Sequence, residues 1–136
     1  MSETTTVPMT GPMTGAVAID GHVHLYPKAD LDRLFTAARD NLIRACPRAT
    51  AIGLLLTETA RDDAFAALAS GSGVPPGWSV RAFPGDAAAL EVDDGAGRPL
   101  LLVAGRQIVT AEGLEVLAPA TALRFADGRP VAEVLA

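Results

Sequence analysis

Two continuous apolar runs, separated by one amphipathic segment, constrain the fold of this chain most strongly. The runs cover residues 16–20 and 51–56, and neither alternates with polar residues as a half-exposed strand does. Between them, apolar residues recur at helical spacing from Leu31 to Ala45, and Asp30 is placed to cap that helix. A buried strand, a helix and a second buried strand are typical of a βαβ unit. We therefore expect two adjacent parallel strands with the helix packed against them.

The second half of the chain has a different pattern. A short helix is expected at about 60–69, followed by a flexible break at 71–77 that contains two prolines. Short strand candidates follow, at 78–83, 88–92, 99–103, 106–110 and 114–118. The last two flank Ala111-Glu112-Gly113, which suits a three-residue hairpin loop with glycine in its third position. The first half is therefore predicted to be α/β and the second half mostly antiparallel β.

Composition excludes several classes of protein. Apolar residues make up 49% of the 136-residue chain, which argues against disorder throughout. Sixteen acidic and eleven basic side chains give a net charge of −5, which argues against a nucleic-acid partner. No apolar run approaches the ~18 residues that span a membrane. Cys46 is the only cysteine, and residues 1–15 lack the features of a signal peptide, so we expect a cytoplasmic protein. We expect a disordered leader at 1–15 and one domain at 16–136.

The most informative motif is His22-Val23-His24, which follows the first predicted strand directly. In an extended segment, residues two apart point the same way, so two imidazoles can converge on one metal ion. Sites in parallel α/β proteins gather at the carboxyl ends of the strands, where this motif lies. The alternative is two surface histidines in a loop.

The segment Asp20-Gly21-His22-Val23-His24-Leu25 resembles the first motif of the polymerase and histidinol phosphatase (PHP) family of metal-dependent hydrolases. The second motif of that family is Thr-Asp-His-Asp, and Thr57-Glu58-Thr59-Ala60 stands in its place. A third element is a Gly-x-Glu strand followed by a strand that begins with His. Here Gln107 stands where the family has Glu, and Glu115 where it has His. The resemblance covers residues 17–118, and only the first motif is intact.

The resemblance implies a partial (β/α) barrel with an antiparallel hairpin in its second half. It also implies a phosphoesterase that binds Zn²⁺ or Mn²⁺ through His22, His24, Glu58 and Glu115 and acts on a small phosphorylated substrate. Gln107 and Thr59 are poor replacements for the family's ligands. A complete barrel needs about 200 residues or more. We therefore expect a degenerate or truncated hydrolase, with weak or absent metal binding and little or no activity.

Four alternatives remain open at this point. The chain could be a non-catalytic binding protein that keeps the fold, or a fragment that resembles an amidohydrolase. Glu58 could serve only the amino terminus of the second helix through the helix dipole, and Glu115 could be a solvated strand residue. An incomplete barrel would also expose a strand edge, through which copies of the chain could associate.

Overall fold

A computed structural model describes residues 15–136 of the chain. The predicted disordered leader, apart from Gly15, lies outside the described residues. Seven strands and three helices follow one another in the described part. They are β1 (Ala16–Val23), α1 (Leu31–Ala45), β2 (Ala49–Leu56), α2 (Ala64–Ala69), β3 (Ser79–Phe83), β4 (Asp86–Asp93), β5 (Leu100–Val103), β6 (Gly105–Val109), β7 (Glu115–Pro119) and α3 (Val131–Val134).

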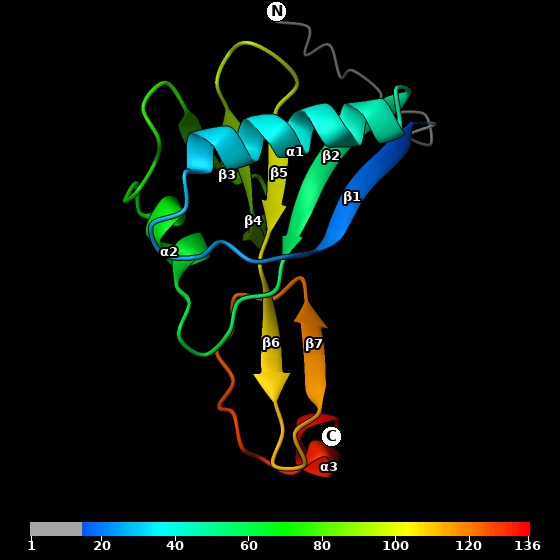
Figure 1. Cartoon of the computed structure of the whole chain (residues 1–136), viewed down its shortest axis with the longest axis vertical. Helices are drawn as coiled ribbons and strands as arrows, with labels where there is room; N and C mark the ends of the chain where they lie inside the picture. Colours follow the sequence, from blue (N-terminus) through cyan, green and yellow to red (C-terminus); the bar gives the residue numbers. More distant parts are fainter. Residues whose placement is uncertain (1–14) are drawn as a thin grey trace, which may run out of the picture.

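The predicted βαβ unit is confirmed. Strands β1 and β2 are adjacent and parallel, and α1 crosses one face of the sheet that they begin (Figure 1). The carboxylate of Asp30 accepts a hydrogen bond from the Arg33 N–H at 3.1 Å and caps the helix. Phe35 of α1 is fully buried against the sheet, and Leu34 packs beside it. Periodicity therefore predicted both the helix and the face that it buries.

The predicted barrel is wrong. The main sheet is open and mixed, with its five strands in the order β1-β2-β5-β4-β3. Strands β1, β2 and β5 are parallel, whereas β4 runs antiparallel to both β5 and β3. A barrel closes when its first strand pairs with its last, but here β1 and β3 are the two edges. The short connections after β3 and β4 allow only antiparallel returns, because a parallel return needs a crossover of about a dozen residues or more.

The second sheet is the predicted hairpin of β6 and β7, which projects beyond one end of the main sheet (Figure 1). Its loop contains Gly113 at φ +79°, the left-handed conformation that a three-residue hairpin loop requires. Strand β6 continues β5 after a single residue and also contacts the chain that leaves β2. Gly105 lies at this crossing, and a Cβ there would clash with the carbonyl oxygen of Leu56. The absence of a side chain therefore lets the two segments approach.

The face of the main sheet opposite α1 is uncovered in the described part of the chain. Val17 and Ile19 of β1 are 54% and 53% exposed, whereas Ala18, on the covered face of the same strand, is partly buried and packs against the core. Leu101 and Val103 of β5 extend this apolar face and are half-buried. Parallel strands are usually covered on both faces, so this sheet departs from that rule.

Trp78, just before β3, packs against α1, and Arg39 of α1 binds the residue that follows β4. The Trp78 indole N–H donates to an Asp32 carboxylate oxygen at 2.7 Å, and the ring meets Phe35 edge-on with centroids 5.4 Å apart. The Arg39 guanidinium lies over the same ring, 5.4 Å from its centroid. It also donates two hydrogen bonds to Asp94, at 2.6 and 2.9 Å. These hydrogen bonds lower the pKa of Asp94 to about 2, with the Ala96 N–H as a further donor.

Candidate functional site

Polar side chains gather where β1 and β2 end, at the carboxyl edge of the parallel strands. The imidazoles of His22 and His24 face one another there, with their Nε2 atoms 3.2 Å apart. The His22 N–H donates to an Asp20 carboxylate oxygen at 3.2 Å, which shapes the end of β1. The sequence prediction that these two imidazoles converge is therefore confirmed.

His24 has contacts on several sides. Its Nε2 lies 3.4 Å from the Thr57 hydroxyl oxygen, so that residue of the second motif adjoins the histidine pair. The Tyr26 ring stacks on the imidazole, with centroids 5.5 Å apart and planes 13° from parallel. The Nδ1 atom is buried and has no hydrogen-bond partner among the described residues. Metal-binding histidines usually donate from their second nitrogen, and this support is missing here.

Glu58 does not join the histidines. Its side chain is 1% exposed and forms an ion pair of 3.2 Å with Arg106. The carboxylate also accepts the Phe65 N–H at 2.8 Å, at the beginning of α2. These contacts agree with the alternative in which Glu58 serves the helix, and they occupy both carboxylate oxygens.

The hairpin residues are also apart from the histidine pair. Gln107 faces Leu117 and Val109 faces Glu115 in the β6–β7 register, so Gln107 and Glu115 share one face of the hairpin, as predicted. Glu115 is exposed at the beginning of β7, beside the hairpin loop. The Gln107 side-chain oxygen is buried without a partner in the described part. Thr59 donates its hydroxyl to Asp62 at 2.9 Å instead of facing His24.

The donor set fits a metal ion only in part. A tetrahedral zinc ion with bonds of about 2.0–2.1 Å to nitrogen holds two such ligands about 3.3 Å apart. The 3.2 Å between the His22 and His24 nitrogens matches that spacing. However, no group of three or more His, Cys, Asp or Glu side chains within residues 15–136 is placed to hold a metal ion. The pair fits two positions of one ion, and the other two predicted ligands do not complete it.

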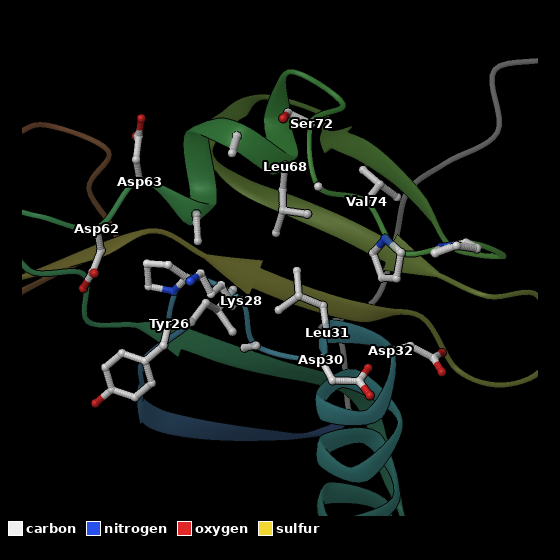
Figure 2. A pocket seen from close by; sticks show the side chains of 18 of the residues that line it. Tyr26, Lys28, Asp30, Leu31, Asp32, Asp62, Asp63, Leu68, Ser72 and Val74 are labelled. Carbon is white, nitrogen blue, oxygen red and sulfur yellow. The ribbon is translucent and has the colours of Figure 1, made fainter.

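A pocket of about 660 Å³ lies at the same carboxyl edge. Its walls are the β1–α1 loop, the β2–α2 loop, helix α2 and the segment that follows α2. Leu31, Leu68 and Val74 surround its open centre (Figure 2). Tyr26 both stacks on His24 and lines this pocket, so the two sites adjoin.

The charged residues of the pocket come from the loops after β1 and β2 and from the first turn of α1. They are Lys28, Asp30, Asp32, Arg61, Asp62 and Asp63. The aspartates lie at opposite ends of the apolar centre, two at each end (Figure 2). Each of the four already accepts a hydrogen bond from another residue. By contrast, neither cation belongs to any ion pair formed within residues 15–136.

Sequence reasoning missed this pocket. Residues 71–77 were expected to be a flexible break, but Val74 and Pro75 form one of its walls. Lys28 offered one signal, since it is the only lysine and lies in the loop after the first strand. Its backbone is left-handed, with φ +67°, which is uncommon for a residue with a side chain.

Comparison of the sequence with protein-family models and with curated proteins, and of the fold with solved structures, finds no match. No helix formed by residues 15–136 is both long and apolar enough to cross a membrane.

Proposed function

We propose that this chain is a binding domain that takes a small molecule in the pocket at the carboxyl edge of β1 and β2. The single observation that carries the proposal is the pocket itself, about 660 Å³ in volume and walled by two loops, α2 and the segment after it. Open α/β sheets bind ligands in the crevice outside the carboxyl ends of their strands. Ligand pockets of about 300–1,000 Å³ are mostly apolar with a few polar groups, as this one is.

The experiment uses 1-octanol as a neutral probe and follows backbone amide shifts by NMR. Saturable shifts are expected in the loop after β1 and along α2. Ala67 lines the pocket and Ala66 is exposed on the same helix, so they make a matched pair. Ala67→Phe should fill the pocket and weaken binding at least tenfold, whereas Ala66→Phe should leave it unchanged. Shifts confined to the open sheet face around Val17 and Ile19, or no saturable shift, would overturn the proposal.

A second candidate is a divalent-metal site at His22 and His24, as the resemblance to the PHP family implies. The 3.2 Å spacing of the two nitrogens favours it. With two protein ligands the affinity should be weak, because catalytic zinc sites use three protein ligands and a water. The enzyme that this second candidate proposes is therefore a degenerate PHP-type phosphoesterase, with little or no turnover of a phosphorylated substrate.

Titration calorimetry with Zn²⁺ and Mn²⁺ tests this candidate, beside an assay on a generic phosphomonoester. Weak binding that is lost in His22→Ala/His24→Ala, with no turnover, is the expected result. Equal binding by both proteins would remove the metal site. Tight binding abolished by the double substitution, together with metal-dependent turnover, would instead establish a working hydrolase.

A further inference from the structure

We infer that the pocket selects a small amphipathic anion, whose head group is bound by Lys28 and Arg61. This inference rests on the proposed binding function and adds the class of ligand. Its first support is the apolar centre formed by Leu31, Leu68 and Val74. An apolar chain buried there gains about 0.8 kcal/mol, or about fourfold in affinity, for each methylene. The body of the ligand is therefore apolar.

The second support is that the charged groups of the pocket differ in whether they already have a partner within the fold. The aspartates outnumber the cations, but each has a partner within the fold. Asp32 accepts the Trp78 indole N–H at 2.7 Å, and Asp30 caps α1. Asp62 accepts from both the backbone and the hydroxyl of Thr59, at 3.0 and 2.9 Å. The fourth aspartate, Asp63, has its own counter-ion.

Asp63 pairs with Arg124 at 2.6 Å, so its charge is neutralised locally. Asp30 also lies at the amino terminus of α1, where the helix dipole favours a negative charge. Lys28 and Arg61 have no such compensation, since none of the ion pairs within residues 15–136 includes either of them. Asp30, Asp32 and Asp62 also belong to no ion pair, but each accepts a hydrogen bond, whereas the side chains of Lys28 and Arg61 have no partner within residues 15–136.

The third support is the placement of the two cations. They come from different loops, one after β1 and one after β2, and both line the same pocket. Lys28 holds this place with a left-handed backbone at φ +67°. Such a conformation is unfavourable for a residue with a side chain, and it persists when the surrounding structure determines it. Carboxylate and phosphate heads share the chemistry that an ammonium and a guanidinium recognise.

The experiment compares four compounds with the same eight-carbon chain on the whole protein, below their micelle concentrations. They are octanoate, octyl phosphate, 1-octanol and octylamine. Both anions should bind more tightly than the alcohol, and the amine most weakly. The ratio of the two anions distinguishes a carboxylate site from a phosphate site.

Neutral variants of the two cations locate the head group. Lys28→Gln and Arg61→Gln should each weaken octanoate binding by about two- to fivefold, the range for exposed ion pairs, and leave 1-octanol unchanged. Arg48→Gln is the control, because Arg48 is exposed beside the amino end of β2, at the opposite edge of the sheet. Proper folding of each variant is checked by its amide spectrum.

The outcomes separate this inference from the proposed function. If 1-octanol binds in the pocket as tightly as the anions, or octylamine binds best, the binding function stands and the anion selectivity is wrong. If the affinity for octanoate does not change in the two Gln variants, the anion selectivity is likewise wrong and the binding function stands. If no eight-carbon compound binds, the proposed function itself fails.

Discussion

Glu58 and Arg106 form an ion pair of 3.2 Å in which both side chains are more than nine-tenths buried. The pair joins the end of β2 to the beginning of β6, where the two segments also share a parallel bridge. Arg106 donates in addition to the Leu123 carbonyl oxygen at 3.1 Å. The ion pair therefore connects the two sheets and the chain after β7.

Removal of Glu58 should destabilise the protein strongly. Glu58→Ala leaves the Arg106 guanidinium buried without its counter-charge and frees the Phe65 N–H, so a loss of about 3–5 kcal/mol is expected. Urea unfolding, followed by the fluorescence of Trp78, measures it. Glu115→Ala is the control, since this exposed glutamate should change the free energy of unfolding by less than about 0.5 kcal/mol. Equal effects of the two substitutions would refute the assignment of Glu58 as a structural residue.

Two isoleucines on neighbouring strands test which sheet face carries the core. Ile52 is fully buried beneath α1, whereas Ile19 is 53% exposed on the opposite face. Ile52→Ala should cost about 2–5 kcal/mol through lost burial and the cavity it leaves. Ile19→Ala should cost less than about 1 kcal/mol. A large loss for Ile19→Ala in the same urea experiment would mean that something covers that face in solution.

The sequence predicted the positions of the helices and strands better than it predicted which strands lie side by side. The apolar period of residues 31–45 defines the helix and its buried face, because only one stripe of a surface helix can reach a core. The runs at 16–20 and 51–56 predicted two buried strands, but only β2 is buried, because β1 is an edge strand and contains no buried residue. Such runs look alike in a barrel and in an open sheet. Nothing local to residues 100–103 shows that β5 lies beside β2, since that pairing depends on the whole path of the chain.

The candidate site was predicted only in part, for a related reason. His22 and His24 are two residues apart in one strand, so their convergence follows from strand geometry. Glu58 is distant in sequence from Arg106, and its position in a resembling motif could not show that a buried guanidinium would take its carboxylate. The second predicted helix also begins later than expected, at Ala64, because Thr59 and Asp62 form a hydrogen-bonded turn first.

A glycine at position 120 should stabilise the protein. Ala120 follows β7 with φ +55°, a left-handed conformation that costs a residue with a Cβ about 1–2 kcal/mol. Ala120→Gly relieves that cost and loses about 0.5–1 kcal/mol to chain entropy, so a net gain of about 0.5–1 kcal/mol is expected. Ala118→Gly, in the strand itself, should destabilise instead. Thermal unfolding of the two variants distinguishes these signs, and a loss at both positions would contradict the expectation.

The Arg39–Asp94 pair should make the free energy of unfolding depend on pH over a narrow acidic range. Its two hydrogen bonds, at 2.6 and 2.9 Å, lower the pKa of Asp94 to about 2 in the folded chain. An aspartate in the unfolded chain has a pKa of about 3.9. Because the folded pKa is the lower one, the contribution of the ion pair to stability is fully present above about pH 4 and is lost as the pH falls toward 2.

Asp94→Asn lacks this titration, so its deficit in stability should be largest above pH 4 and shrink toward zero near pH 2. Urea midpoints of both proteins at pH 6, 4, 3 and 2 measure the difference. Asp86→Asn is the control, since Asp86 lies on β4 but belongs to no ion pair within residues 15–136, and its difference from the wild type should not follow this window. A deficit of Asp94→Asn that stays constant down to pH 2 would mean that Arg39 does not hold Asp94 in solution as it does in the structure.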